Sequence, residues 1–289
     1  NEVSEGRGSP HGGAFLDIAS QRPDEYIKKK LPSMHEQFIE LAEVDITNDP
    51  MEVGPTLHYF MGGIRVDPDT QASTVPGLFA CGEAAAGLHG ANRLGGNSLS
   101  DLMVFGRLAG QGVADYVQEL SETPEVHDDQ VGEIVDDAKA FLEREEGENP
   151  FMIHEDLQDL MQECVGILRT EDELEEALEG LEDLKGRLDN AKAHPTSQFN
   201  AGWHKALDLQ SLIEMAQAVA SAALEREESR GAHTRLDFEG EREEWGEVNI
   251  LVRKEDGELV IDHYDRPEPP EELAEIGYAS LEELEQGDV

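Results

Sequence analysis

The sequence predicts a protein of mixed class, in which an α/β segment is followed by an all-α segment. Three observations lead to this prediction. A short apolar run, Leu78 to Cys81, ends in Gly82-Glu83 and precedes a long helical pattern over 99–120. Four stretches between about residues 128 and 227 then carry apolar residues three and four positions apart. Beyond Trp245, apolar and polar residues alternate, which is typical of a β-hairpin.

The first 55 residues contain one strand pattern and two helical patterns. Residues 14–18 predict a short strand, and 24–30 predict a helix that Pro23 opens. Ser33 is predicted to cap a second helix that runs to residue 43. Proline-containing pairs over 49–55 predict a linker before the next domain.

The run Leu78 to Cys81 is predicted to be a buried strand, because it follows the turn signal Pro76-Gly77. Gly82 has no Cβ, so a ligand or another backbone can come close to it. Glu83 stands just beyond the strand end, which is where open α/β folds bind ligands. A carboxylate there is suited to accept hydrogen bonds from a ribose diol. The alternative is an ordinary surface carboxylate.

Asn97 and Ser98 are predicted to start the long helix, because Asn is a favoured N-cap residue. Its many small residues, such as Gly106 and Gly112, indicate a close approach to another backbone or to a flat cofactor. The N–H groups at a helix start carry partial positive charge and favour an anionic ligand. A reduced flavin is one such ligand.

Arg93 and His58 are candidate ligands of carboxylates. Arg93 lies between glycine-rich turns shortly before the helix, and a guanidinium matches a carboxylate in a bidentate manner. His58 precedes Tyr59 and the Gly62-Gly63 turn, and could donate to a second carboxylate. The alternatives are a structural histidine and an ordinary ion pair. Two such donors near a flavin site favour a dicarboxylate substrate.

Several longer motifs carry a resemblance to a known family. They are HYFMGG (58–63), GLFACGE (77–83), HGANRLGGNSL (89–99), VFGRLAG (104–110), VGILRTEDELEEAL (165–178) and ESRGAHTRLDF (228–238). With these motifs the chain resembles the flavoprotein subunit of succinate dehydrogenase and fumarate reductase along nearly its whole length.

The resemblance implies a reaction and a set of site residues. Hydride would pass between a carbon of succinate or fumarate and an FAD cofactor. His58 and Arg93 match positions that hold the substrate carboxylates, and Glu83 matches a residue that contacts the FAD ribose. The remaining cofactor-binding positions predicted are Gly82, Asn97, Ser98 and Leu99, the last two through their backbone. The proton-donating arginine of the family is expected upstream, and no residue of this chain matches it.

The resemblance also predicts the domain organisation. Residues 1–55 would end a capping domain, 56–120 an FAD-binding α/β domain, 121–240 form a helical bundle, and 241–289 form a β-hairpin and an acidic tail. No G-x-G-x-x-G sequence occurs, so the chain is interpreted as the C-terminal portion of a longer flavoprotein.

The partners implied are membrane anchor subunits and an iron–sulfur subunit, with this chain at the cytoplasmic side of the cell membrane. Two alternatives stay open. One is L-aspartate oxidase, a relative that uses the same core, although the hairpin pattern after Trp245 argues against it. The other is a truncated, non-catalytic fragment.

The C-terminal half is predicted to be structural. Its helices are expected over 128–146, 153–168, 171–188 and 206–227, with Thr170 and Glu173 as a capping box. A turn is expected over 254–258, and one short helix over 281–285. Arg230, His233 and Arg235 stand close together in an acidic region. They could bind a carboxylate or bridge two domains, and the sequence does not decide between these roles.

The composition is strongly acidic, with 65 Asp and Glu against 22 Lys and Arg and a formal net charge of -43. The acidic residues are spread along the chain, which favours a halophile-type surface over an acidic tail or a nucleic-acid mimic. Nucleic-acid binding is disfavoured because no basic patch is visible. Cys81 and Cys164 are predicted to be buried free thiols in a reducing compartment rather than a disulfide or metal ligands. No apolar run is long enough for a membrane span.

Overall fold

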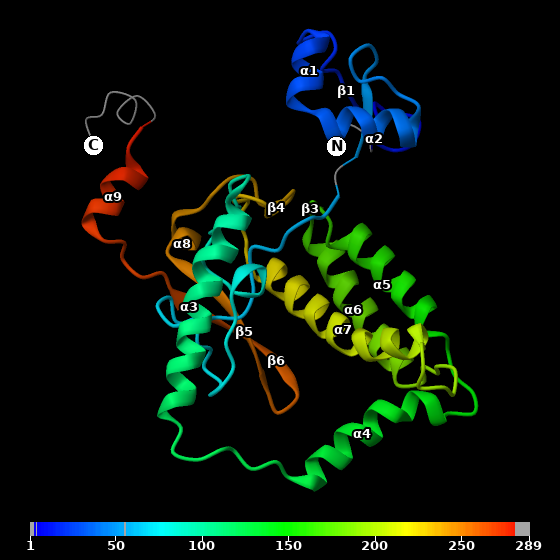
Figure 1. The fold of residues 1–289 in the computed structure, drawn as a ribbon, viewed down its shortest axis with the longest axis vertical. Helices are drawn as coiled ribbons and strands as arrows, with labels where there is room; N and C mark the ends of the chain where they lie inside the picture. Colours follow the sequence, from blue (N-terminus) through cyan, green and yellow to red (C-terminus); the bar gives the residue numbers. More distant parts are fainter. Residues whose placement is uncertain (1–2, 4, 55, 281–289) are drawn as a thin grey trace. The chain divides into compact units, whose positions relative to one another are not determined.

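The computed structural model describes residues 3, 5–54 and 56–280, and its chain divides into two compact units. Unit 1 comprises Asn1–Phe60 and unit 2 comprises Met61–Val289. Figure 1 labels the helices and strands of both units. The mixed class predicted from the sequence is confirmed.

Unit 1 consists of a two-stranded antiparallel sheet and two helices. Strands β1 (Ala14–Leu16) and β2 (Met51–Val53) pair in antiparallel register. Helices α1 (Asp24–Lys30) and α2 (Pro32–Ala42) lie between them in the chain, and Ile27, Ile46 and Met51 form the core. Strand β1 and both helices were predicted, whereas β2 lies within the stretch 49–55 that was predicted to be a linker, and the predicted N-cap of α2 was wrong. Leu31 is the cap and Ser33 lies inside the first turn, since Pro32 occupies a position where its missing N–H costs nothing.

Unit 2 opens with an irregular segment that leads into the 3₁₀ turn η1 (Gly82–Ala84) and the long helix α3 (Asn97–Glu119). The prediction of a buried strand over Leu78 to Cys81 was wrong. Phe79 makes a single bridge to Ala72, and Leu78 is exposed. A buried strand needs hydrogen-bonding partners along its length. The described residues supply only that bridge, so the apolar run stays irregular.

The helical part of unit 2 is a bundle around one apolar core. Its helices are α4 (Asp128–Glu143), α5 (Pro150–Cys164), α6 (Glu171–Leu188) and α7 (Ala201–Glu225). Helix α6 packs against both α5 and α7, as Figure 1 shows. The largest fully buried apolar side chains of this core are Ile153, Leu174, Leu181, Leu209 and Ile213.

The ends of these helices follow from their capping residues. The capping box at Thr170 and Glu173 is present, as predicted, and α6 has the predicted bounds. Helix α7 begins five residues earlier than predicted, because the side chain of Asn200 accepts a hydrogen bond from the Trp203 N–H at 3.0 Å. Asn149 caps α5 in the same way and moves its start to Pro150.

Four short elements and one hairpin complete unit 2. Strands β3 (Leu168–Arg169) and β4 (Thr234–Arg235) form a parallel two-residue pair. Helix α8 (Glu243–Gly246) precedes the antiparallel hairpin of β5 (Val248–Glu255) and β6 (Glu258–Asp265), and α9 (Glu271–Tyr278) follows it. Asp256 and Gly257 form the predicted turn, both with positive φ. The helix predicted over 281–285 lies outside the described residues.

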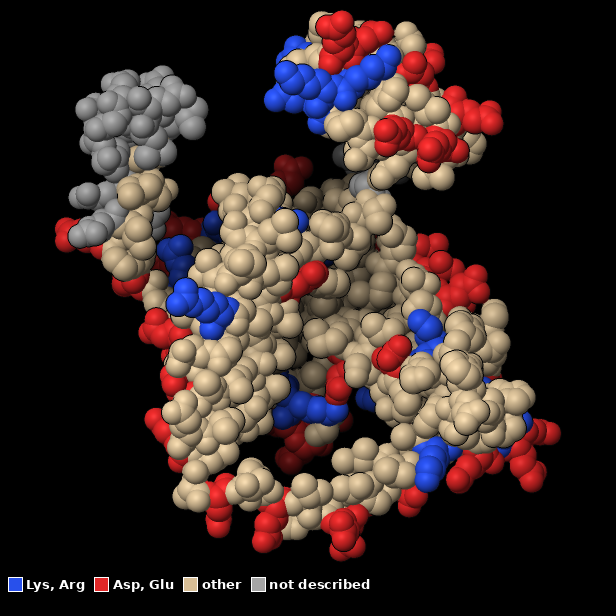
Figure 2. Space-filling model, in the orientation of Figure 1, with Lys and Arg blue, Asp and Glu red and all other residues tan. Residues whose placement is uncertain are grey.

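The remaining features of the fold are the distribution of charged side chains and the state of the two cysteines. Figure 2 shows Asp and Glu side chains scattered over the visible face of unit 2, with a largely uncharged area over α3. Cys164 is a buried free thiol, and burial raises its pKa. Cys81 is also free but only half-buried, contrary to the prediction, because its run is not a covered strand. Among the described helices, none is both long and apolar enough to cross a membrane.

Candidate active site

The predicted cofactor-binding residues of unit 2 gather around the first turns of α3. Gly82 is buried in η1, and a Cβ placed on it would lie 2.5 Å from the Leu102 side chain of α3. The turn that carries Glu83 is therefore packed directly against the helix. Glu83 itself is exposed.

The start of α3 is open to a ligand. Its N-cap is Gly96, with φ of 88°, and not Asn97 as predicted. No side chain among the described residues caps it. Leu99 in the first turn is 72% exposed. The first N–H groups of a helix have no intrahelical partner and carry partial positive charge, so this end fits an anionic or electron-rich ring. These residues therefore fit the flavin that the resemblance implies.

The loop that carries Arg93 leads straight into this helix start. Arg93 is half-buried, between Gly90 and Gly96. At the other end of the loop, the His89 ring lies 3.4 Å from the carboxylate of Asp101 on α3, and both side chains are largely buried. An open pocket of about 270 Å³ lies here. It is lined by Leu88, His89, Asn97, Ser100, Asp101, Val104 and Phe105.

Backbone hydrogen bonds connect Ile64, the residue after the HYFMGG motif, to the segment of η1. The Ile64 N–H donates to the Ala84 carbonyl at 2.8 Å, and the Ala86 N–H donates to the Ile64 carbonyl at 2.9 Å. A Cβ at Gly63 would lie 2.5 Å from the Ala84 oxygen, so glycine is required for this approach. His58, at the other end of the motif, belongs to unit 1, where it is exposed. Its place in the site stays a prediction.

A second group of polar residues lies after α7, and the sequence indicated it only by its density of basic residues. Glu228 is fully buried and accepts hydrogen bonds from Arg226 at 2.6 Å and from the Arg230 Nε at 2.8 Å. The Arg242 N–H also donates to it at 2.9 Å. Burial opposes ionisation of Glu228, but the hydrogen bonds from Arg230, from the Arg242 backbone and from Arg226 outweigh it and hold its pKa at about 2.

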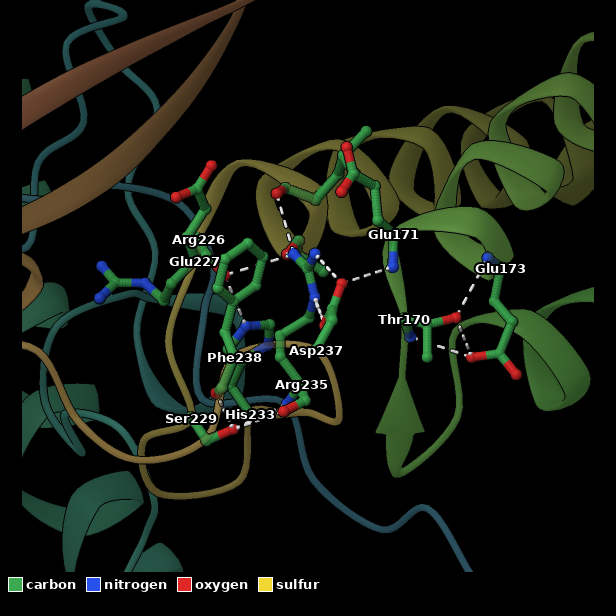
Figure 3. A network of polar contacts seen from close by, with 12 residues as sticks. Thr170, Glu171, Glu173, Arg226, Glu227, Ser229, His233, Arg235, Asp237 and Phe238 are labelled. Carbon is green, nitrogen blue, oxygen red and sulfur yellow. Dashed lines mark hydrogen bonds and ion pairs between the residues drawn. The ribbon is translucent and has the colours of Figure 1, made fainter.

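Arg235 is the other buried charge of this group, and Figure 3 shows its partners. Its guanidinium donates to both carboxylate oxygens of Asp237, at 2.8 and 2.7 Å, and holds the pKa of Asp237 at about 2. Asp237 also accepts from the Glu171 N–H at the start of α6, at 2.8 Å. The cluster therefore connects the end of α7 to the start of α6. The structural role left open for Arg235 is supported by these contacts.

His233 is held as a neutral ring within the same group. The Arg169 guanidinium donates to its Nδ1 at 2.9 Å, so its Nε2 carries the proton and donates to the Arg226 carbonyl at 3.1 Å. Burial lowers its pKa, and the nearby guanidinium groups of Arg169, Arg226 and Arg235 lower it further. Within the described residues, no three His, Cys, Asp or Glu side chains are grouped so as to hold a metal ion.

The glycine–carboxylate turn and the uncapped helix start place a carboxylate and free backbone N–H groups next to each other, and both kinds of group can hold a ligand. The comparisons with known proteins agree. The FAD binding domain family matches residues 1–99, and the family of the fumarate reductase flavoprotein C-terminus matches residues 154–274. Both matched families are flavoprotein families, and the one that matches residues 1–99 is an FAD-binding domain.

Two curated proteins and one solved structure illustrate the similarity. A CoM/CoB fumarate reductase subunit of Methanothermobacter marburgensis is 39% identical over 262 residues, 90% of this chain and 46% of that protein. The succinate dehydrogenase flavoprotein subunit of Coxiella burnetii is 38% identical over 252 residues, 82% of this chain and 42% of that protein. Mycobacterium smegmatis Sdh1 in complex with UQ1 matches with a TM-score of 0.86 and 49% identity, over 98% of this chain and 48% of that one. The chain thus spans less than half the length of these relatives.

Proposed function

We propose that the protein containing this chain interconverts succinate and fumarate with FAD, and that this chain supplies a carboxylate ligand and part of the flavin site. The observation that carries the proposal is the convergence on α3. The Glu83 turn packs against this helix, its start is uncapped, and the Arg93 loop runs directly into it. The relatives named as succinate dehydrogenase and fumarate reductase flavoproteins support the same function.

Each residue has a distinct task in the proposed reaction. The Arg93 guanidinium binds one substrate carboxylate in bidentate manner and so fixes the orientation of the carbon chain. The backbone N–H groups of Ser98 and Leu99 stabilise negative charge at the start of α3. Glu83 accepts hydrogen bonds from a ribose diol. When FAD is bound, it accepts or donates the hydride. No residue of this chain is assigned the proton transfer.

His58 is assigned to the second carboxylate of the substrate. The support is the sequence resemblance at HYFMGG alone, because His58 belongs to unit 1. An imidazole that donates one hydrogen bond to a carboxylate is chemically suited to this task.

Substitution of Arg93 tests the proposal. Arg93→Lys in the flavin-loaded protein should lower kcat/KM for succinate about 10- to 100-fold, because an ammonium cannot replace the bidentate fork. Dye reduction measures the rate. The matched control is Arg107→Lys, an exposed arginine further along α3, which should retain full activity.

The outcomes separate the alternatives. Near-normal activity of Arg93→Lys would remove Arg93 from the substrate site. Oxidation of aspartate in place of succinate would assign the protein to L-aspartate oxidase. If the complete protein neither bound flavin nor oxidised succinate, the non-catalytic fragment would be the better description.

We further propose that electrons leave through an iron–sulfur subunit, which membrane anchor subunits hold on the cytoplasmic side of the cell membrane. The curated relatives above are named as subunits, which supports an assembly of several chains. Purification through a tag on this chain should recover an iron–sulfur protein, visible by its absorption and its electron paramagnetic resonance. Recovery of the flavoprotein alone from gently lysed cells would contradict this part.

The acidic surface is proposed to be an adaptation to high salt. A formal charge of -43 repels itself, and salt screens that repulsion. The melting temperature should therefore rise as sodium chloride is raised from about 0.1 M, where the Debye length is about 10 Å, to 1 M, where it is about 3 Å. A melting temperature that does not respond to salt would remove this interpretation.

A further inference from the structure

A tight turn from the C-terminal half of the chain touches the loop that carries Arg93. The turn spans Arg230 to His233, and its two ends exchange backbone hydrogen bonds of 2.9 and 3.0 Å. At its tip, the Ala232 N–H donates to the Ala91 carbonyl at 3.0 Å. Ala91 stands two residues before Arg93 in the chain. The turn therefore holds the backbone next to the candidate substrate ligand.

Gly231 makes this contact possible. Its φ of +60° lies in the left-handed region, which favours glycine. A Cβ added to it would lie 2.5 Å from the Ala91 carbonyl carbon and closer still to its oxygen. Because these are backbone atoms, the overlap could be relieved only by moving the Ala91 segment or the turn. The separation of the two segments is thus set by the absence of a side chain.

The base of the turn is fixed by the buried charges around Glu228. Arg230 donates to both oxygens of the Glu228 carboxylate, at 2.8 and 3.0 Å. The adjacent Ser229 hydroxyl lies 3.0 and 2.9 Å from the carbonyls of Arg235 and Phe238, and accepts from the Arg235 N–H at 2.9 Å. A bidentate pair with a buried carboxylate holds its geometry, so the base of the turn restricts the movement of its tip.

The Arg93 loop is also held from the opposite end. His89 pairs with the buried Asp101 of α3 at 3.4 Å. The segment from His89 to Arg93 is therefore attached to α3 at its first residue and to the Arg230–His233 turn at Ala91. Arg93 stands two residues after the second attachment, which limits the positions that its guanidinium can reach.

We propose that the Arg230–His233 turn positions Arg93 for the substrate carboxylate, and that Gly231 and Arg230 are positioning residues for dicarboxylate binding. This inference rests on the function proposed above. Neither residue contacts the reacting atoms. A displaced Arg93 would bind substrate less well, whereas the flavin site at η1 and the start of α3 would stay intact.

Gly231→Ala, with Gly240→Ala as its matched control, tests the inference in the flavin-loaded protein. Gly240 lies in the same C-terminal segment with φ of +80°, but no atom of the described residues would come within 4 Å of its added Cβ. The control therefore introduces similar backbone strain without pressing on Ala91. The measurements are the flavin content, the amide hydrogen exchange of the peptide 88–95, KM and kcat for succinate, and the dissociation constant of malonate. Malonate carries two carboxylates but no adjacent pair of methylenes to desaturate, so it reports binding alone.

The expected result for Gly231→Ala is a rise of about tenfold in KM and in the malonate dissociation constant, which corresponds to about 1.4 kcal/mol. Its flavin content should be unchanged, and exchange in the 88–95 peptide should be faster. Gly240→Ala should resemble the parent in each of these quantities. Arg230→Lys keeps the charge but loses the bidentate grip on Glu228, so it should shift KM in the same direction by a smaller factor. If Gly231→Ala does not fold, the KM of Arg230→Lys tests the positioning role in its place.

The failure of this inference can be told apart from that of the proposed function. If the parent protein binds malonate and oxidises succinate, but Gly231→Ala and Arg230→Lys leave KM and the malonate constant unchanged, the positioning role is overturned and the function stands. If the parent neither binds malonate nor oxidises succinate, the proposed function is wrong and the role in carboxylate binding falls with it.

Discussion

The helical bundle and the segment around α3 use the same kind of amphipathic helix with opposite results. In the bundle, Leu174, Leu181 and Leu209 are each 0% exposed. On α3, Leu99 is 72% exposed and Met103 is 78% exposed. The bundle helices bury their apolar sides against each other, whereas α3 presents much of its apolar surface outward, over the uncharged area seen in Figure 2.

The difference shows that helical periodicity predicts an apolar side of a helix but not whether another part of the protein buries it. Helices α5, α6 and α7 follow one another in the chain and pack together, so their apolar sides are satisfied locally. Helix α3 packs only partly, through Gly82 of η1 and through Gly112, where an added Cβ would overlap the Thr70 carbonyl. A surface of this kind is suited to be covered by a flat cofactor or by further protein.

The sharpest test of the comparison is one truncation in each region. Leu181→Ala should lower the free energy of unfolding by about 2–5 kcal/mol, because it leaves a cavity in a closed core. Met103→Ala should change it by less than about 0.5 kcal/mol, because that side chain is exposed. Urea denaturation measures both. Equal losses would mean that the outer side of α3 is covered in solution, and the comparison would break.

The next effect in size concerns the buried carboxylate of Glu228, which follows the last bundle helix. Glu228→Gln should cost about 3 kcal/mol, since it removes a buried carboxylate from between Arg226 and Arg230. This is the lower end of the usual range, because both guanidinium groups keep some contact with solvent. Glu227→Gln, at an exposed neighbour, is the control and should be nearly neutral. A loss no larger than that of the control would show that the cluster does not stabilise the fold.

The same cluster predicts how stability depends on pH. The folded pKa of His233 is below its ordinary value of 6.5, so the unfolded chain takes up the proton first and stability falls as the pH drops below about 6.5. Glu228 has an ordinary pKa of 4.5 and a folded pKa of about 2. Its contribution is present above pH 4.5 and is lost as the pH falls toward 2.

Denaturation series at several pH values measure this dependence. In Glu228→Gln, the decline between pH 4.5 and 2 should be shallower than in the parent. An unchanged slope there would assign the acid sensitivity to other carboxylates, such as Asp237, whose folded pKa is also about 2.

The smallest predicted effect is the cap of α6. Thr170→Ala should cost about 1 kcal/mol, because the hydroxyl that accepts from the Glu173 N–H is lost. Thr170→Ser keeps that hydroxyl and should cost clearly less. Thermal unfolding of the two variants side by side checks the difference. Equal losses would indicate that the threonine methyl, and not the cap, contributes the stability.

Local patterns predicted the elements whose determinants lie within a few residues. The bounds of α1 and α6, the capping box at Thr170 and the Asp256-Gly257 turn all depend on such near neighbours. The strand predicted over Leu78 to Cys81 failed for the opposite reason. Whether an apolar run becomes a strand depends on hydrogen-bonding partners from elsewhere, and the described residues offer only Ala72.

The candidate site divides in the same way. The sequence by itself determined the glycine–carboxylate turn at Gly82 and Glu83 and the helix that starts beside Asn97. Both are set by local backbone preferences. Only the tertiary structure decided that Gly231 lies against Ala91 and that Glu228 is buried between arginines. Contacts between residues so distant in the chain arise from packing of the C-terminal segment against the Arg93 loop, and no local preference encodes that packing.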